Sequence, residues 1–431
     1  MMRAQFVRHV ATLLSGKAIA QVLSLAMVPI IARLFDPRDF GVVAIFSVVA
    51  QGLALVAPLR YFRASLLTED DERARMLLAM SVKALLVACV LVLVVVAIAG
   101  PGGFSVGFLA PLGIWVWLIP VGMFLLGMDN IMTTVNSRHK TFRRVAMADV
   151  GEALLMGATR ILAGLGGSSV WGLIAGIIVS GSGRLVILAR GALGPFALLR
   201  TRMEWRQVKE LAVEYRDFPL NDVPAGLVTF LAGRVPILMM GVMFAPAVVG
   251  YYAMADRLIR LPVVNAGIPI REVFMRKLAA NINSGFGLRR PLTLLTLGML
   301  ALGVVPFGLL GFFGSEILTV LLGERWADAG VYTQILAPWY YAAWVSTGVQ
   351  PTLVTLRRQG LWLRIQFGTL LGRLTVFGIG YLTAADVETT LKWFSGLNVL
   401  SALLVLALVF HILTTQGGAA ARPNGGPTAV G

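Results

Sequence analysis

The stretch "LFDPRDFGVVAIF" (residues 34–46) recurs later in the chain, without its charges, as "MFAPAVVGYYAMA" (residues 243–255). The two stretches share four residue types at a constant offset of 209 positions: Phe35/Phe244, Pro37/Pro246, Gly41/Gly250 and Ala44/Ala253. These identities indicate an internal repeat. A Pro-x-x-x-Gly turn that is used twice to join two helices would give the same match, and the two interpretations are compatible.

The composition of the chain indicates a lipid environment. Of the 431 residues, 58% are hydrophobic and only 13% are charged, and the mean hydropathy is +0.82. Soluble domains contain about 45–50% apolar and about 25% charged residues, so a soluble core could not hide this much apolar surface. The sequence therefore predicts an all-α membrane protein that crosses the bilayer many times.

Twelve segments contain the roughly 20 predominantly apolar residues that a membrane-spanning helix needs. They cover residues 10–33, 40–59, 77–99, 111–131, 147–166, 170–189, 217–242, 248–269, 291–314, 331–352, 361–383 and 393–413. The fifth segment and the seventh, which holds Arg234 and several prolines, fit this requirement least well. Without one of them, the two termini would lie on opposite sides of the membrane.

The distribution of lysine and arginine predicts the orientation of these spans. If both termini are cytoplasmic, most of the 37 basic residues fall in cytoplasmic segments, and only Arg38, Arg325 and Lys392 fall in external loops. This asymmetry is the one that the positive-inside rule describes, and it favours an even number of spans. The net charge of +16 then reflects membrane topology and not a nucleic-acid partner.

The repeat and the spans together predict two halves of six helices each. We expect an N-terminal six-helix bundle over residues 1–200, a cytoplasmic linker over 201–216 and a C-terminal six-helix bundle over 217–414. The Gly-, Pro- and Ala-rich residues 415–431 predict a disordered cytoplasmic tail. Internal repeats are common in transporters, whose substrate site lies near the bilayer midplane between the repeats.

Ionisable residues inside the predicted spans indicate the kind of substrate. Each costs about 2.5–3.5 kcal/mol at a helix centre and usually faces a cavity or a partner. They are mostly cationic: Lys17, Arg160, Arg184, Arg234, Asp256, Arg257, Arg260 and Arg373. A proton relay would favour carboxylates and histidines, whereas a guanidinium binds phosphate oxygens bidentately and keeps its charge. The excess of arginine therefore favours an anionic substrate.

The positions of these residues rank them. Arg234 and Asp256 each lie about eight residues inside their spans, which at 1.5 Å per residue places both about 12 Å deep. Asp256 and Arg260 are four residues apart on one helix, so a purely structural pair, Asp256–Arg260 or Asp256–Arg234, is also compatible with the sequence. Arg184 and Arg373 rank lower, because long side chains can snorkel to the membrane interface.

Two groups of candidate site residues follow. The candidate substrate-binding residues are Arg234, Arg257, Arg260, Lys17 and Arg160. If transport is coupled to an ion, Asp256 and Glu152 are the best-placed carboxylates. We expect no metal site and no cofactor, because the three histidines are scattered, Cys89 is the only cysteine and there is no Gly-x-x-x-x-Gly-Lys loop for ATP.

Two longer stretches carry a family resemblance. "SGKAIAQVLSLAMVPIIARLFDPRDFGVVAIF" (residues 15–46) resembles the opening of the O-antigen and exopolysaccharide flippases of the MOP (multidrug/oligosaccharidyl-lipid/polysaccharide) superfamily. Their first span is followed by a Pro-x-x-(Phe/Tyr)-Gly turn, here Pro37, Phe40 and Gly41. "YRDFPLNDVPAGLVTFLAGRVPILMMGVMFAPAVVGYYAMADRLIRLP" (residues 215–262) resembles the family's Tyr-x-x-Phe-Pro segment and its Val-Gly-x-Tyr-x-x-Ala stretch.

The resemblance implies a transporter and not an enzyme. Such flippases move undecaprenyl-diphosphate-linked oligosaccharides from the cytoplasmic to the periplasmic leaflet of the bacterial inner membrane, by alternating access of two six-helix bundles around a cationic cavity. The resemblance makes five cations candidate contacts of the diphosphate or of an acidic sugar: Arg234, Arg257, Arg260, Lys17 and Arg160. The expected partners are the lipid-linked oligosaccharide, the bilayer, a glycan polymerase and a chain-length regulator.

Alternatives stay open at this point. A peptidoglycan-precursor flippase of the same superfamily is expected to carry additional C-terminal spans, and a multidrug exporter is expected to bury acidic rather than basic residues. A membrane glycan polymerase or ligase would need a large periplasmic loop. The longest predicted external segment covers only residues 315–330, approximately.

Overall fold

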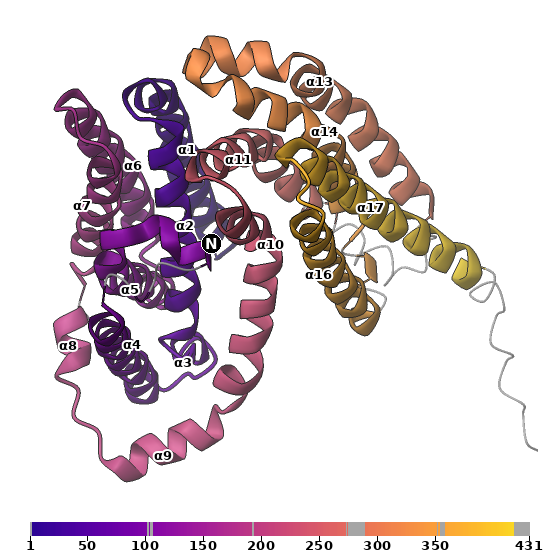
Figure 1. Ribbon diagram of the computed structural model, residues 1–431. Helices are drawn as coiled ribbons and strands as arrows, with labels where there is room; N and C mark the ends of the chain where they lie inside the picture. The colour runs from indigo at the N-terminus through magenta and orange to yellow at the C-terminus, as the bar shows by residue number, and fades with distance from the viewer. Residues whose placement is uncertain are drawn as a thin grey trace, which may run out of the picture. The chain divides into compact units, whose positions relative to one another are not determined.

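Helices coincide with all twelve segments that the sequence predicts to span the membrane (Figure 1). The computed structural model describes residues 2–100, 103, 107–191, 194–272, 274, 289–350, 352–353 and 358–417, and this part contains no β-strand. Side chains of residues 2–14, 359 and 415–417 are not described. The last helix continues to Gly417, and residues 418–431 of the predicted tail lie outside the described part.

Contacts divide the chain into two units. The first comprises Met1–Ala253 with Leu321–Arg325, and the second comprises Met254–Val320 with Trp326–Gly431. The predicted halves, which meet at residues 201–216, rest on the repeat and not on contacts, and they stay a prediction.

The first unit contains most of the helices. They are α1 (Met2–Leu34), α2 (Pro37–Val56), α3 (Tyr61–Ala64), α4 (Asp71–Ala99), η1 (Gly107–Leu118), α5 (Ile119–Arg138), α6 (Phe142–Leu165), α7 (Val170–Leu188), α8 (Pro195–Leu199), α9 (Trp205–Glu214), η2 (Phe218–Asp222) and α10 (Val223–Met243). Helix α11 (Pro246–Ile259) crosses the boundary. The second unit adds η3 (Val263–Gly267), α13 (Arg289–Leu322), η4 (Glu324–Trp326), α14 (Ala327–Thr347), α16 (Gln359–Leu382) and α17 (Val387–Gly417).

Nine helical segments of the described part are long and apolar enough to cross a membrane, which makes the chain a multi-pass membrane protein. The remaining three predicted spans correspond to α6, α11 and α14. Helix α6 carries several charges, and α11 has only 14 residues. The sequence predicts an unbroken span over 248–269, but a turn at Arg260 and the π-helical η3 interrupt it next to Pro262, which has no N–H to donate.

Helices α1 and α6 pack closely and parallel to each other in the first unit. A β-carbon on Gly16 would overlap Ala146, one on Gly157 would overlap Met27, and one on Gly164 would lie 2.8 Å from the β-carbon of Leu34. Each of these pairs is separated by 130 positions, so the two helices run in the same direction. Small residues at such contacts let helix backbones approach closely in a membrane, where burial against lipid gives little driving force.

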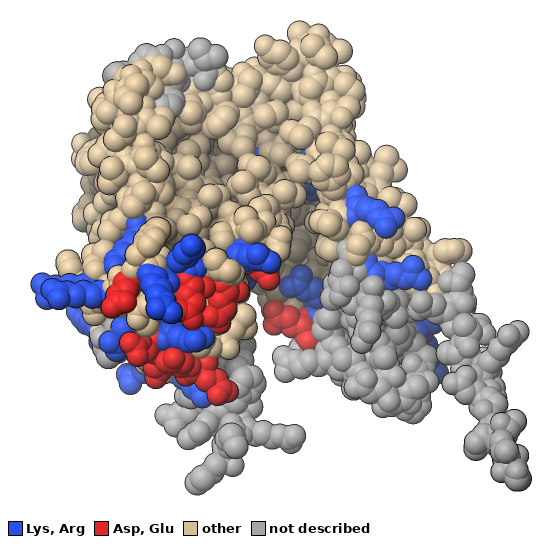
Figure 2. Space-filling model, turned by 90° about the horizontal axis from the view of Figure 1, so that it is seen from below, with Lys and Arg blue, Asp and Glu red and all other residues tan. Residues whose placement is uncertain are grey.

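Ion pairs gather at one end of the first unit. Asp222, at the end of η2, pairs with Arg60 at 3.0 Å and with Arg63 at 2.8 Å. Arg138, at the end of α5, pairs with Asp71 at 2.7 Å and donates to backbone carbonyls of the segment that joins α3 to α4. Figure 2 shows the lysine, arginine and acidic side chains crowded together on this face, so the charges mark one boundary of the spans.

Candidate functional site

Lys17 and Arg160 lie on the packed helices α1 and α6 but do not come together. The parallel packing brings Lys17 level with residue 147, which is 13 residues, or about 20 Å, from Arg160 along α6. Arg160 is 7% exposed, and its Nε donates to the carbonyl oxygen of Leu173 on α7 at 3.3 Å. Lys17 is exposed and makes no ion pair with any described residue. One diphosphate could not contact both cations in this arrangement.

Arg234 lies half-buried on α10 and faces α2. A terminal nitrogen of its guanidinium donates to Oε1 of Gln51 at 3.4 Å. One turn away, Gly52 lies against the ring of Phe230, so the two helices pack closely at this level. The partner of Arg234 is thus a neutral amide. No described acidic side chain pairs with this guanidinium, which lies in a helix pair of the first unit.

Asp256 and Arg260 form the pair that their spacing allows, one of the two pairs that are compatible with the sequence. Arg260 lies 2.7 Å from the carboxylate of Asp256, which is 6% exposed. The hydroxyl of Tyr340 on α14 donates to the same carboxylate, and Arg260 lies 3.4 Å from that hydroxyl. This contact neutralises Arg260 within the second unit.

Arg257 differs from its neighbour Arg260. It is exposed, and among the described residues it has no ion-pair or hydrogen-bond partner. Successive helix residues point about 100° apart, so the side chain of Arg257 leaves the helix about 100° away from that of Asp256. Of the five predicted substrate-binding cations, Arg257 and Lys17 are therefore the two that are exposed and have no described ion-pair or hydrogen-bond partner.

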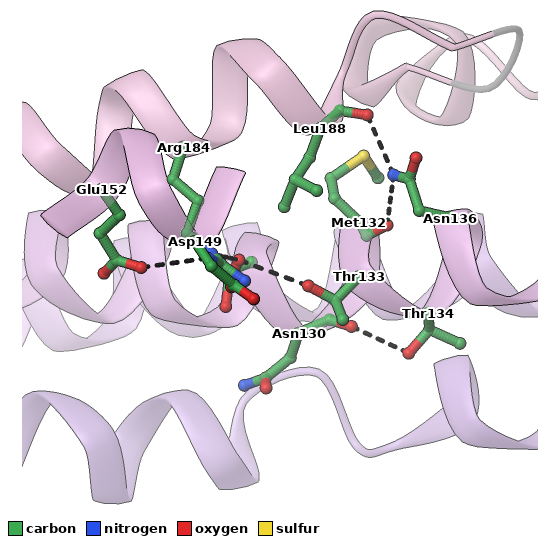
Figure 3. A network of polar contacts seen from close by, with 10 residues as sticks. Asn130, Met132, Thr133, Thr134, Asn136, Asp149, Glu152, Arg184 and Leu188 are labelled. Atoms are coloured by element: carbon green, nitrogen blue, oxygen red, sulfur yellow. Dashed lines mark hydrogen bonds and ion pairs between the residues drawn. The ribbon is translucent and has the colours of Figure 1, made fainter. Parts of the chain in front are cut away.

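Arg184 on α7 is the centre of a buried network (Figure 3). It is 8% exposed, its Nε lies 2.5 Å from Asp129, and one terminal nitrogen lies 2.5 Å from Asp149 and 3.1 Å from Glu152. The expectation that the Arg184 side chain snorkels to the membrane interface is therefore wrong. Three carboxylates from α5 and α6 hold the side chain inside the bundle.

The network around Arg184 carries excess negative charge. Three carboxylates and one guanidinium sum to a formal charge of −2 when all are ionised. The Oδ2 atom of Asp149 is buried without a hydrogen-bond partner in the described part of the chain, whereas the Glu152 side chain is 35% exposed. Such a group of acids can take up a positive charge, because burying an uncompensated carboxylate is costly.

Arg373 on α16 is also held inside its unit and does not snorkel. Its Nε and a terminal nitrogen lie 2.9 and 2.6 Å from Oδ1 of Asn398 on α17. The guanidinium carbon lies 5.6 Å from the ring centre of Trp339 and 5.8 Å from that of Phe394. Aromatic faces attract a cation at this distance, so this arginine stabilises the contact between α16 and α17.

Sequence reasoning missed most partners of these arginines. Gln51 and Tyr340 carry no charge and lie in apolar segments, so nothing in the sequence marks them. Asp129 and Asp149 are visible as acids near the span ends, but their distances from Arg184 along the chain, 55 and 35 residues, hide the contact. A search for acids at similar depth in neighbouring spans is the one signal that could have found them.

Known proteins resemble this chain in sequence family and in fold. The model of a family described as "polysaccharide biosynthesis protein" matches residues 30–330. No curated protein sequence matches the chain.

Solved structures match over nearly the whole length. The inward closed form of the lipid II flippase MurJ has a TM-score of 0.70 at 10% identity, covering 94% of this chain and 90% of that one. An inward-facing multidrug resistance MATE transporter of the MOP superfamily has a TM-score of 0.63 at 13% identity, covering 94% and 95%. A eukaryotic MATE transporter has a TM-score of 0.53 at 11% identity, covering 96% and 98%.

At these identities, the structures establish a shared fold. All three are transporters or flippases and not enzymes. The family match covers well over half of the chain and includes both repeated stretches, residues 34–46 and 243–255. The chain is a member of the polysaccharide biosynthesis protein family, built on the all-helical fold of MOP-superfamily transporters.

Proposed function

We propose that this protein is a flippase for polyprenyl-diphosphate-linked oligosaccharides in polysaccharide synthesis. One combination of observations carries the proposal: a polysaccharide-biosynthesis family member has the fold of a lipid-linked precursor flippase. The head of such a lipid cannot cross hydrocarbon unaided, because its polar groups would lose their hydration. A transporter that alternates its access between the two sides supplies that passage without hydrolysing ATP.

Cations of the chain fit the diphosphate in this proposal. Arg257 is the principal candidate contact, because it is exposed and has no partner among the described side chains. Lys17 is a second candidate for the same reason. Arg234 can add a third contact by exchanging its neutral partner Gln51 for a phosphate oxygen. Arg260 and Arg160 would have to leave their present contacts first, and they rank lower.

Glu152 is the better of the two carboxylates proposed for ion coupling. Asp256 is already neutralised by Arg260 and accepts a hydrogen bond from Tyr340. Glu152 belongs to a network with excess negative charge and is partly exposed. We propose that a proton or a sodium ion enters this network during the transport cycle.

Reconstitution of the purified chain into liposomes tests the flippase directly. A fluorescent undecaprenyl-diphosphate-linked oligosaccharide is included in both leaflets, and an impermeant glycosidase is added outside. Without ATP, the chain is expected to raise the cleaved fraction from about half towards completion, because inner-leaflet lipid becomes accessible. Cleavage that stays at the level of protein-free liposomes contradicts the proposal.

The same liposomes separate the alternatives. Lipid II replaces the oligosaccharide lipid in one arm, and a fluorescent cationic drug is loaded inside in another. Movement of lipid II alone identifies a peptidoglycan-precursor flippase, and export of the drug alone identifies a multidrug exporter. In cells, deletion of the gene is expected to trap lipid-linked repeat units on the cytoplasmic leaflet.

The proposed topology places both termini in the cytoplasm of a bacterium, with the chain in the inner membrane. Cys89 is the only cysteine, so a Cys89→Ser variant accepts single reporter cysteines. An impermeant maleimide added to intact spheroplasts is expected to label Asp386→Cys, in the exposed turn before α17, and not Arg206→Cys on α9. The reverse pattern would invert the orientation.

A further inference from the structure

A groove of about 430 Å³ lies between α16 and α17 of the second unit. Both helices are membrane spans, so the groove lies within the bilayer. Its wall on α17 is formed by Leu397, Leu400 and Leu404, which recur at three and four residues and share one helix face. Leu400 and Leu404 are 66% and 51% exposed. The wall is therefore apolar and in contact with lipid.

The opposite wall of the groove is opened by a glycine. Gly368 lines the groove on α16, and a β-carbon built there would have no atom within 4 Å. Next to this glycine, the hydroxyls of Thr369 on α16 and Ser401 on α17 are 2.8 Å apart and form a hydrogen bond between the two helices. The groove therefore has open space at Gly368 and hydroxyls that are already hydrogen-bonded, so it suits a hydrocarbon chain.

Arg364 lines the groove on the N-terminal side of Gly368 and supplies its one charge. It is exposed, and the described residues offer it neither an ion pair nor a hydrogen bond. Arg373 on the same helix, in contrast, is satisfied by Asn398 and two aromatic rings. Arg364 lies about one and a half turns from the start of α16. An unpaired charge there is unfavourable unless the side chain reaches the lipid headgroups or binds an anion.

We propose that this groove binds one anionic phospholipid, with the phosphate on Arg364 and an acyl chain lying over Gly368 against the three leucines. A guanidinium matches phosphate oxygens bidentately. A single arginine suits the single charge of a phosphodiester, whereas a diphosphate calls for more donors. None of the five candidate substrate cations lines the groove, so this lipid is distinct from the proposed transported substrate.

Native mass spectrometry of the purified full-length chain with added phosphatidylglycerol tests the site. Gly368→Leu places a side chain in the groove, and its β-carbon would meet no protein atom within 4 Å. Gly378→Leu on the same helix is the matched control, since its β-carbon would also meet nothing. We expect Gly368→Leu to weaken phosphatidylglycerol binding at least tenfold and Gly378→Leu to leave it unchanged. Equal affinities in the two variants would overturn the proposal.

The charge is tested separately. Arg364→Gln is expected to weaken phosphatidylglycerol binding about tenfold, in line with the strength of a charge-assisted hydrogen bond, whereas Arg364→Lys keeps most of it. Zwitterionic phosphatidylethanolamine is expected to bind more weakly to the unaltered chain and to lose little affinity in Arg364→Gln. If undecaprenyl diphosphate displaces phosphatidylglycerol and depends on the same two residues, the groove holds the substrate's lipid and the assignment to a phospholipid is wrong.

Discussion

Gly41 and Gly250, which occupy equivalent positions of the internal repeat, lie directly against each other. A β-carbon on Gly41 would overlap the carbonyl oxygen of Pro246, and a β-carbon on Gly250 would overlap that of Pro37. The contact is reciprocal, as in an interface between two identical partners related by a two-fold axis. The repeated Pro-x-x-x-Gly motif therefore does more than turn the chain, because its glycines let the starts of α2 and α11 touch.

Gly41→Ala is expected to destabilise the protein by about 1–3 kcal/mol, the usual cost of overpacking, although alanine is the better helix former. The double variant Gly41→Ala/Gly250→Ala should lose less than the sum of the single losses, because both methyl groups force apart the same contact. Thermal unfolding in detergent measures both effects. Gly298→Ala, where a β-carbon would meet nothing, serves as the control. Strict additivity would contradict the reciprocal contact.

Length and composition were enough to predict the fold class. An apolar run of about 20 residues between charged ends has few alternatives to a membrane helix, and all twelve predicted segments are helical. The repeat at 34–46 and 243–255 aligned Gly41 with Gly250 but did not predict that the two glycines touch. What the sequence did not predict is the break after Ile259, because hydropathy is insensitive to the hydrogen bond that Pro262 removes.

Arg257→Gln is expected to reduce translocation at least tenfold while leaving thermal unfolding unchanged, because the side chain is exposed and has no described partner. Arg160→Gln is the comparison. Its side chain is buried and donates to Leu173, so its loss should lower the unfolding free energy by about 1–3 kcal/mol. The glycosidase assay in liposomes and thermal unfolding are run on both variants. Normal translocation by Arg257→Gln would remove it from the substrate site.

The candidate site could be predicted in its residue types but not in its pairing. The sequence identified Arg160 and Arg184, the two buried arginines of the described residues, since a charge within an apolar run stands out. It also allowed the Asp256–Arg260 pair, whose two members are one turn apart. The sequence did not predict which side chains of different helices contact each other. Snorkelling was expected for Arg184 because a long side chain can reach the membrane interface. Its three acidic neighbours come from other helices, and only the packing of α5, α6 and α7 brings them together.

Tyr340→Phe and Tyr341→Phe form a matched pair that tests the contact around Asp256. The Tyr340 hydroxyl donates to the buried Asp256 carboxylate, whereas the Tyr341 hydroxyl donates to the carbonyl oxygen of Leu300 at a more exposed position. Removing a hydrogen bond from a buried charged group costs more than removing one from a neutral carbonyl. We expect a loss of about 1.5–3 kcal/mol for Tyr340→Phe and at most about 1 kcal/mol for Tyr341→Phe in thermal unfolding. Equal losses would show that Asp256 does not depend on the hydroxyl.

Arg184→Leu is expected to be the most destabilising single change among these predictions. Removing one partner of a buried ion pair typically costs about 3–5 kcal/mol, because the remaining charge is left without compensation, and here three carboxylates lose their common cation. Arg206→Leu, which changes an exposed arginine on α9, is the control and should have little effect.

The decisive comparison is the recovery of stability in variants of Arg184→Leu. Adding Asp129→Asn and Asp149→Asn to Arg184→Leu removes the repulsion and should restore part of the lost unfolding free energy, whereas the same two changes with Arg184 retained should destabilise, because they weaken its ion pairs. If the added changes destabilise both backgrounds equally, Arg184 contributes through packing and not through its charge.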